Sequence, residues 1–321
     1  MPSTNISTAL DTGATTPTLR RPSISSTLTG SSSDSPASPI SIPQDGNGTA
    51  APSASLPDAA SYPGQKRSLA GIALRAFCLG AALMTGVILA MALALLPWMQ
   101  TRTMTVGSGE RTAATMLLAP LWRLPFFLAA LSTFHFLEFW ITARYNTQAT
   151  SVDSFLLTAN WPAYAIAHLA AFVECFIRYT LLRHAPHVLS FVPVLPLPSR
   201  TTVMLAGLVL VVVGQAVRTA AMVQAGRSFN HMVQHKRAAS HALVTDGIYA
   251  WLRHPSYFGF FWWALGTQLV LGNVVCLLGY MAVLWRFFSV RIRHEEQLLV
   301  RFFGDDYVQY QKRVGTKIPF I

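Results

Sequence analysis

The stretch AFCLGAALMTGVILAMALALL, from Ala76 to Leu96, constrains the fold more than any other feature because it carries no charge. An α-helix rises about 1.5 Å per residue, so roughly 20 apolar residues are enough to cross the hydrocarbon core of a bilayer. The composition agrees, since 52% of the 321 residues are hydrophobic and only 12% are charged. We therefore expect an integral membrane protein rather than a soluble enzyme.

Apolar segments recur along the rest of the chain at spacings typical of a multi-pass membrane protein. Their boundaries predict an all-α fold of about six to eight transmembrane helices, including helical hairpins. Beyond the first segment they lie at about 113–140, 154–178, 187–197, 202–222 and 256–290. Several are interrupted by ionisable residues, which at such depth face other helices or water-filled cavities. These residues are Arg123, His135, Glu138, His168, Glu174 and Arg218.

The last apolar segment, 256–290, is too long for one simple span and contains a turn signal, Leu271-Gly272-Asn273. It predicts a helical hairpin whose two arms return to the same membrane face. That topology would bring the stretch 249–257 close to the stretch 291–296.

The first 65 residues are rich in Ser, Thr, Pro, Gly and Ala, a composition that cannot bury enough apolar surface to offset the entropy of ordering. We expect a disordered tail over 1–65 and one membrane-embedded domain over 66–321, with the functional site mainly in 225–321. Lys66, Arg67 and Arg75 flank the first span, which predicts a cytosolic tail.

The formal net charge of +11 could indicate nucleic-acid binding. The basic residues lie instead at the ends of apolar segments, as lipid headgroups and the positive-inside bias favour, so we expect membrane lipid and no nucleic acid as partner. The cysteines Cys78, Cys175 and Cys276 lie inside apolar segments without metal-ligand spacing, which argues against disulfides and structural zinc.

Two polar segments flank the predicted hairpin and are candidates for a site. The first is GRSFNHMVQHKRAASHALVTDGIYAWLRHPSY and the second is WRFFSVRIRHEEQLLVRFFGDDYVQYQKRV. Arg291 and Glu295 lie four residues apart, on one face of a helix that continues out of the membrane. A surface pair of this kind contributes at most about 1 kcal/mol. The crowding of histidines, the proline at a helix start and the neighbouring aromatic residues favour a site for a polar, charged and flat ligand, whereas no zincin-type histidine spacing is present.

Several of these segments resemble the isoprenylcysteine carboxyl methyltransferase family. The resemblance covers FNHMVQ, HALVTDGIYAWLRHPSYFGFFWWALGTQ, LWRFF, EEQLL, FFGDDYVQYQKRV and the final IPFI, and extends more loosely to STFHFLEFWITARYN and DSFLLTANWPAY. It is strong from about residue 225 to the end of the chain. The motif RHPSY alone is less specific, because related membrane methyltransferases and reductases share R-H-P-x-Y.

The resemblance implies a multi-pass enzyme of the endoplasmic reticulum membrane, with an active site facing the cytosol. It would use S-adenosylmethionine and no metal to methylate the C-terminal carboxylate of prenylated CaaX proteins, such as small GTPases. Arg291 would contact the substrate carboxylate. The implied cofactor contacts are Gln234, His241, Ala242, Leu243, Val244, Tyr249, His254, Pro255, Ser256, Tyr257 and Glu295. Ala242 departs from the larger polar residue of the motif, which matters little if backbone groups hold the cofactor there.

The residue types suit this chemistry. A C-terminal carboxylate ordinarily has a pKa of about 3.3–3.7, so at neutral pH it is already a nucleophile and needs no general base. An arginine at 291 can pair with it bidentately and fix its direction. Aromatic faces at Tyr249 and Tyr257 could favour a cationic sulfonium, and Glu295 could accept from the cofactor amine or ribose. His254 and Gln234 could bind either the adenine or the cofactor carboxylate, and Arg253 either an anion or a lipid headgroup.

Two alternatives from other functional classes remain. A phospholipid or other small-lipid methyltransferase would share the cofactor core, but an amine nucleophile would leave Arg291 unexplained. A non-catalytic membrane scaffold or transporter could use Glu138, Glu174 and Arg218, yet a transporter is expected to show two similar halves, and the sequence contains no such repeat.

Overall fold

The computed structural model describes residues 58–103, 119–158, 161–180, 200–237 and 241–321. Most of the expected disordered tail and the apolar stretch 187–197 lie outside these described residues. The last part of the predicted tail, 58–65, is described: it contains the short helix η1 (Ala59–Ser61), where the Asp58 side chain accepts a hydrogen bond from the Ala60 N–H. The tail boundary at residue 65 stays a prediction.

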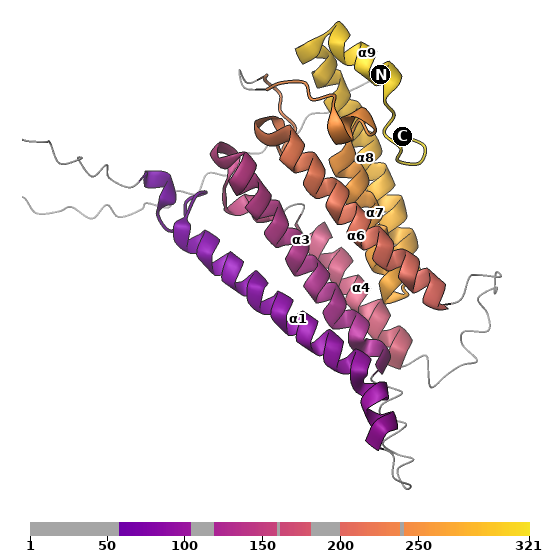
Figure 1. The fold of residues 1–321 in the computed structure, drawn as a ribbon. Helices are drawn as coiled ribbons and strands as arrows, with labels where there is room; N and C mark the ends of the chain where they lie inside the picture. Colours follow the sequence, from indigo (N-terminus) through magenta and orange to yellow (C-terminus); the bar gives the residue numbers. More distant parts are fainter. Residues whose placement is uncertain (1–57, 104–118, 159–160, 181–199, 238–240) are drawn as a thin grey trace, which may run out of the picture. The chain divides into compact units, whose positions relative to one another are not determined.

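The described residues form helices and contain no strand (Figure 1). This confirms the all-α class predicted from the apolar segments. Figure 1 shows α1 beside α3, and α9 at the same end of the molecule as the C-terminal end of α8. The long helices are α1 (Leu69–Thr103), α3 (Arg123–Tyr145), α4 (Ala163–Thr180), α6 (Arg200–Ala225), α7 (Pro255–Leu271) and α8 (Val275–Phe303), followed by the shorter α9 (Asp305–Arg313).

Four helices in the described part of the chain are long and apolar enough to cross a membrane. They comprise Leu69–Met99, Pro120–Tyr145, Thr201–Ser228 and Val275–Phe303. The apolar helices α4 and α7 pack against members of this group. The chain is therefore a multi-pass membrane protein, while the expected total of six to eight spans stays a prediction.

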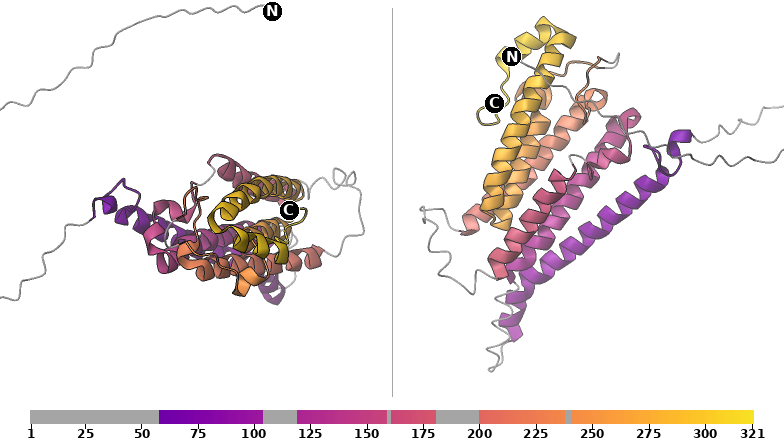
Figure 2. Two further views of the ribbon diagram at one scale, coloured as in Figure 1. Left: turned by 90° about the horizontal axis from the view of Figure 1, so that it is seen from above. Right: turned by 180° about the vertical axis from the view of Figure 1, so that it is seen from behind.

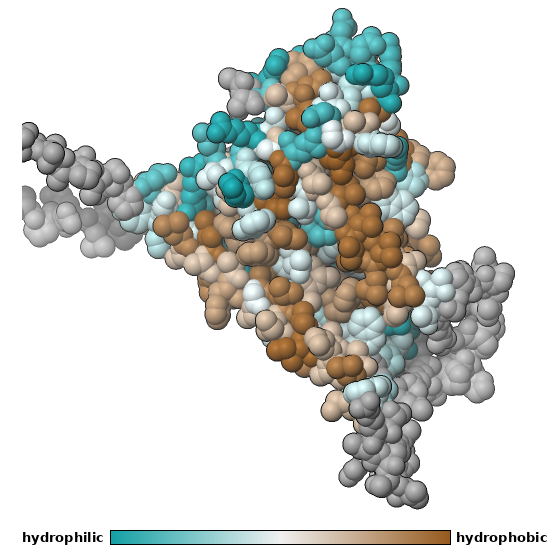
Figure 3. All heavy atoms as spheres, in the orientation of Figure 1, coloured by the Kyte–Doolittle hydropathy of each residue, from teal (hydrophilic) through white to brown (hydrophobic). Residues whose placement is uncertain are grey.

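The surface pattern agrees with a membrane environment (Figure 3). Hydrophilic residues gather around α9, and hydrophobic residues cover much of α1 and α6 below them. Many large apolar side chains of α1, including Phe77, Met84 and Ile88, are exposed rather than packed inside the protein. Lipid tails satisfy such side chains as well as a protein interior does, so this exposure is expected of a lipid-facing helix.

The predicted hairpin is confirmed between α7 and α8, which lie side by side (Figure 2). Gly272 ends α7 with φ +74°, in the left-handed region that a side chain disfavours, and its N–H donates to carbonyls of the last turn. Asn273 then secures the turn, because its Nδ2 donates to the Ala171 carbonyl and to Gln268 Oε1.

Glu174 of α4 caps the start of α8. Its carboxylate oxygens accept hydrogen bonds from the N–H groups of Val274, Val275 and Cys276 at 2.6–2.9 Å. These N–H groups have no partner within the helix, and the helix dipole favours a negative charge at this end. The expectation that Glu174 faces another helix is therefore confirmed.

One predicted segment was placed too early. The sequence predicted an apolar segment from 154 to 178, whereas α4 begins only at Ala163. Residues Val152–Phe155 instead form the short helix η4, whose start is capped by the Ser151 hydroxyl. Pro162 precedes α4, and its carbonyl accepts the N–H of Ile166, so the proline lies at the helix start, where its missing N–H costs nothing.

Helices α6 and α7 pack through glycines, backbone against backbone. A Cβ on Gly259 would lie 2.6 Å from the Gly214 carbonyl oxygen, and a Cβ on Gly266 would lie 2.8 Å from the Gly207 carbonyl oxygen. Gly214 and Gly207 meet α7 just as closely from the other side. Small residues at such positions let two helices approach without a hydrophobic driving force from water.

We expect Gly259→Ala to destabilise the protein because neither backbone can move aside without separating α6 from α7. Overpacking of this kind costs about 1–3 kcal/mol. The matched control is Gly279→Ala in α8, where an added Cβ meets nothing within 4 Å. Thermal unfolding in detergent should show a lower midpoint for Gly259→Ala and an unchanged or higher one for Gly279→Ala. Equal midpoints for the two variants would contradict a tight glycine contact.

Candidate active site

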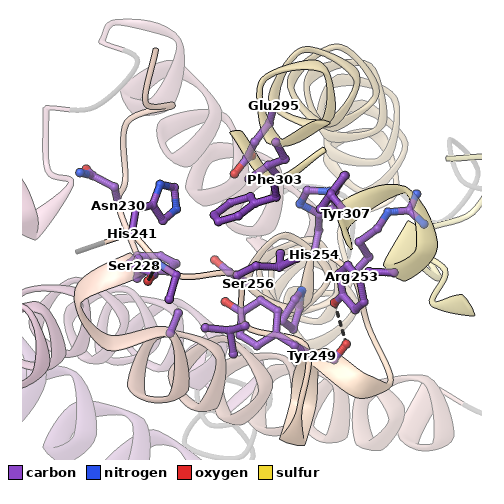
Figure 4. A pocket seen from close by; sticks show the side chains of 18 of the residues that line it. Ser228, Asn230, His241, Tyr249, Arg253, His254, Ser256, Glu295, Phe303 and Tyr307 are labelled. Atoms are coloured by element: carbon purple, nitrogen blue, oxygen red, sulfur yellow. Dashed lines mark hydrogen bonds between the residues drawn. The ribbon is translucent and has the colours of Figure 1, made fainter. Parts of the chain in front are cut away.

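Two pockets adjoin one another at the start of α7, next to α8. The first, which we call the polar pocket, collects side chains from the loop before α7, from α7 itself, from α8 and from α9 (Figure 4). The second, the apolar pocket, lies among α3, α4, α6, α7 and α8. Phe229, Asn230, Ser256 and Tyr257 line both pockets and so form the wall between them.

His254 and Pro255 shape the entrance to α7. Pro255 is the first helical residue, where its fixed φ and missing N–H are tolerated, and His254 precedes it as the N-cap. The His254 ring stacks on Tyr257 with 5.4 Å between ring centroids and 4° between planes. Its Nε2 lies 3.2 Å from Glu296 Oε1, which fixes the ring at the edge of the polar pocket.

Arg253 is held by three hydrogen bonds to protein groups. Its Nε donates to Glu296 Oε1, and its Nη1 donates to the carbonyls of Gln311 and Val314. The C-terminal segment reaches this position because Ile318 is buried against α7 and α8. These bonds use Nε and Nη1, and Arg253 also lines the polar pocket, so the anion partner or headgroup contact suggested by the sequence stays a prediction.

Tyr257 links Arg291 and Glu295, which lie four residues apart on α8. Arg291 Nε donates to the Tyr257 hydroxyl at 2.9 Å, and this hydroxyl donates to Glu295 Oε2. Among the described residues, the structure records no direct ion pair between Arg291 and Glu295. A pair of surface charges is therefore replaced by a three-residue network that connects the polar pocket to the apolar one.

Arg291 lines the apolar pocket, and part of its guanidinium has no partner among the described residues. Its Nε donates to Tyr257 and its Nη2 donates to the His231 carbonyl at 2.6 Å. A guanidinium carries five N–H donors, so the edge formed by Nη1 and the second hydrogen of Nη2 is left for a further acceptor. Two parallel bonds to a carboxylate are the arrangement that this edge favours.

The rest of the apolar pocket is aromatic and aliphatic. Its lining includes Phe134, Leu156, Tyr164, Phe260, Phe287 and Phe288, with Met232 near Arg291. Positive charge enters only at Arg218 and Arg291. A ligand with a long apolar part and one anionic end would match this distribution.

Arg218 is already neutralised by a buried carboxylate. Its Nε and Nη2 donate to the two oxygens of Glu138, the second at 2.8 Å, and its Nη1 donates to Ser256 O and Oγ. The Glu138 side chain is 1% exposed and that of Arg218 is 9% exposed. Charges removed from water this far are stable only when paired and fully hydrogen-bonded. The pair anchors the first turn of α7 through Ser256.

The His241 and Tyr249 rings, which lie outside the membrane spans, are neutral at pH 7. Burial lowers the pKa of His241, and the nearby Arg237 lowers it further despite the opposing charge of Glu295. Burial also raises the pKa of Tyr249, so its phenol stays protonated and donates to the Ala221 carbonyl at 3.3 Å. Glu295 is the carboxylate among the pocket-lining side chains.

The structure brings together nearly all residues expected to bind a cofactor. They line the polar pocket as one group: His241, Ala242, Leu243, Val244, Tyr249, His254, Pro255, Ser256, Tyr257 and Glu295. Gln234 is outside both linings, and its side-chain amide donates to the Met232 carbonyl. Arg291 lines the apolar pocket, separated from the cofactor group by Tyr257.

Sequence reasoning missed several lining residues of the polar pocket. Ser228, Phe229, Asn230, Phe303, Tyr307 and Tyr310 all contribute. The motifs FNHMVQ and FFGDDYVQYQKRV contain all of these except Ser228. The resemblance to the family therefore covered these residues, but it did not indicate that they line a pocket. The Tyr307 hydroxyl is buried and has no hydrogen-bond partner among the described residues.

Residues with metal-ligand chemistry do not cluster in the described ranges: no group of three or more His, Cys, Asp or Glu side chains is placed to hold an ion. Cys78, Cys175 and Cys276 are unpaired.

Comparison with known proteins shows relatives that are similar to this chain in sequence and in fold. The family model of the isoprenylcysteine carboxyl methyltransferase (ICMT) family matches residues 206–301. The protein-S-isoprenylcysteine O-methyltransferase of Schizosaccharomyces pombe is 49% identical over 203 residues, covering 61% of this chain and 83% of the relative. The Saccharomyces cerevisiae protein of that name is 47% identical over 195 residues, covering 61% of this chain and 79% of the relative.

The Homo sapiens protein of the same name is 43% identical over 195 residues, and the match spans 61% of this chain but only 64% of that relative. A solved structure described as the eukaryotic intramembrane Ras methyltransferase ICMT superposes with a TM-score of 0.61 at 33% identity, covering 78% of this chain and 77% of that one. These matches favour an enzyme over a scaffold or transporter. The chain belongs to the isoprenylcysteine carboxyl methyltransferase family and is a membrane-embedded methyltransferase of that family.

Proposed function

We propose that this protein methylates the C-terminal carboxylate of isoprenylated cysteine, using S-adenosylmethionine, with the acceptor in the apolar pocket and the methyl donor in the polar pocket. One observation carries the proposal: Arg291 presents a free edge at the polar end of a pocket that is otherwise aromatic and aliphatic. A prenyl chain suits the apolar lining, and the carboxylate suits the guanidinium. The shared wall keeps the two reactants within reach of one another.

The polar pocket suits S-adenosylmethionine by the chemistry of its donors and acceptors. The group supplies a methyl on a cationic sulfonium, which the faces of Tyr249 and Tyr257 would favour. Glu295 offers a carboxylate to an amine or ribose hydroxyl, and the unpartnered Tyr307 hydroxyl is available to a further polar atom. If backbone groups of residues 242–244 bind the cofactor, the side chain at position 242 matters little. Ala242 can then replace the larger polar residue of the family motif without loss of binding.

Arg291 supplies orientation rather than acid or base chemistry. The acceptor carboxylate is already ionised at neutral pH, so the reaction requires no proton to be removed. Transferring this carboxylate from water into the pocket without a hydrogen-bond partner would cost free energy. Hydrogen bonds from the free Nη1–Nη2 edge of Arg291 offset that cost and fix the direction of one carboxylate oxygen. Tyr257 and His231 hold the guanidinium still, so its alignment is set before the substrate arrives.

We propose that the site lies where the helices leave the bilayer, because its substrate needs both surroundings. A prenylated C-terminus is amphiphilic, with a tail that prefers hydrocarbon and a carboxylate that stays at the interface. We propose prenylated CaaX proteins, including small GTPases, as substrates. We place the protein in the endoplasmic reticulum membrane, with the polar pocket facing the cytosol.

The test is incubation of membranes containing the full chain with labelled S-adenosylmethionine and N-acetyl-farnesylcysteine. A base-labile methyl ester on the farnesylcysteine is the expected product. Label appearing only in phospholipid would instead support a lipid methyltransferase. Membranes without the chain provide the background.

Removing the Glu295 charge should weaken cofactor binding. A hydrogen bond to a charged group contributes about 1.5–3 kcal/mol, which corresponds to a loss of affinity of roughly 10- to 150-fold in Glu295→Gln. Calorimetric titration with S-adenosylhomocysteine in detergent measures it. Asp153→Asn is the matched control, since Asp153 is an exposed acid outside both pocket linings. We expect His254→Ala to weaken binding by a similar amount, because the ring lines the same pocket; unchanged affinity would leave both residues without a binding role.

A further inference from the structure

The segment Phe229–Met232 lies between the two pockets and is tied to the C-terminal turns of α3. Asn146 Nδ2 donates to the Phe229 carbonyl at 2.9 Å. Thr142 Oγ1 lies 3.2 Å from His231 Nε2. Both bonds join residues more than 80 positions apart, so α3 determines where this segment sits.

The donor in the Thr142–His231 contact follows from the rest of the network. The Thr142 hydroxyl has one hydrogen and donates it to the Glu138 carbonyl at 2.7 Å. Thr142 Oγ1 must then accept from His231, which assigns the ring hydrogen to Nε2. Nδ1 faces Glu138 Oε2 at 3.6 Å, too far for a hydrogen bond.

His231 remains neutral at pH 7 in these surroundings. Its pKa is lowered to about 4, mainly by burial; the Glu138 charge opposes this shift, and the charges of Arg218 and Arg291 add to it. A neutral ring with one hydrogen can donate to Thr142 without adding a third positive charge beside the two arginines. The bond from Nε2 to Thr142 is thus present throughout the physiological pH range.

His231 in turn determines the orientation of Arg291. The His231 carbonyl accepts from Arg291 Nη2 at 2.6 Å, while Tyr257 accepts from Nε. These two bonds fix the plane of the guanidinium and leave its Nη1–Nη2 edge free. If His231 moved, this edge would turn away from the apolar pocket.

We propose that Thr142 and His231 are positioning residues that set the direction of Arg291 from the C-terminal turns of α3. The inference rests on the proposed role of Arg291 as the carboxylate partner. It extends the functional site to a helix outside the region 206–301 that the family model matches.

The test is Thr142→Val, which keeps the side-chain shape and removes the acceptor for His231. Thr133→Val is the matched control, because the Thr133 hydroxyl makes the same bond to the carbonyl four residues earlier in α3, the only hydrogen bond that the structure gives it. One neutral hydrogen bond contributes about 0.5–1.5 kcal/mol, so kcat/KM for N-acetyl-farnesylcysteine should fall about 2- to 12-fold in Thr142→Val relative to Thr133→Val.

A second measurement separates positioning from general destabilisation. Binding of the carboxylate ligand N-acetyl-farnesylcysteine should weaken in Thr142→Val, whereas inhibition by its uncharged methyl ester should not change. Affinity for S-adenosylhomocysteine should also match that of Thr133→Val. His231→Gln, whose amide can donate to Thr142, should retain more carboxylate affinity than His231→Ala.

Two results would overturn the inference: identical behaviour of Thr142→Val and Thr133→Val, or equal loss of carboxylate and ester affinity. Arg291→Ala distinguishes this failure from failure of the proposed function. If Arg291→Ala loses the preference for the carboxylate while Thr142→Val keeps it, only the positioning role is wrong. If Arg291→Ala keeps the preference, both the carboxylate contact and its positioning are wrong.

Discussion

Arg291→Ala should lower kcat/KM for a farnesylcysteine substrate by two orders of magnitude or more, which corresponds to about 3 kcal/mol of transition-state stabilisation. The reason is the loss of the free guanidinium edge at the polar end of the apolar pocket. Cofactor affinity should change little, because Arg291 does not line the polar pocket. Turnover and S-adenosylhomocysteine binding measured on the same preparation test both parts.

Two further variants sharpen the result for Arg291. Arg291→Lys should also be poor, because an ammonium has three N–H donors, too few to serve Tyr257, His231 and two parallel bonds to a carboxylate. Arg293→Ala is the matched control, since Arg293 is exposed and its Nε donates only within its own helix, to the Ser289 carbonyl. A surface pair would predict a loss of at most about 1 kcal/mol with lysine nearly equivalent. Near-normal turnover of a folded Arg291→Ala protein would require another cation to hold the carboxylate.

Glu138→Ala should reduce the free energy of unfolding by about 3–5 kcal/mol, because it leaves the buried Arg218 guanidinium without its counter-charge. Each kcal/mol shifts the unfolding midpoint by about 2–4 °C in a domain of this size, so we expect a decrease of roughly 6–20 °C in detergent. The change should appear whether or not ligands are bound, unlike the effects of Glu295 and Arg291.

The double variant Glu138→Met/Arg218→Met separates stability from function. Replacing a buried pair with apolar side chains of similar volume is often neutral or stabilising, so the midpoint should recover. Activity should not recover, because Arg218 also holds Ser256 O and Oγ at the wall between the pockets. A Glu138→Ala midpoint equal to that of the wild type would mean that solvent reaches the pair.

The hairpin and the convergence of Tyr257 with Arg291 were predictable from the sequence because their signals are local. A turn at Leu271-Gly272-Asn273 inside an apolar run determines that both arms return to one face. Most residues that line the polar pocket were also predictable, because those from His241 to Tyr257 lie in one segment that carries a family motif.

The pairings that hold the site together could not be predicted. Glu138 and Arg218 are 80 residues apart, and Thr142 and His231 are 89 apart. Nothing in the spacing of an ionisable residue along an apolar helix indicates which other helix it meets. Arg253 shows the same limit, because its partners Gln311 and Val314 become neighbours only when the C-terminus folds back onto α7 and α8.

If Arg291 binds the substrate carboxylate as proposed, the bonds that Tyr257 and His231 make to it would also favour release of the product. Methylation converts the carboxylate to a neutral ester, which can no longer form charge-assisted bonds with the Nη1–Nη2 edge. The guanidinium would keep its orientation, because Nε still donates to Tyr257 and Nη2 still donates to the His231 carbonyl. The finished ester is then retained only by its prenyl tail, which lipid solvates equally well. In the proposed mechanism, each turnover would return the product to the bilayer and leave the arginine in place for the next acceptor.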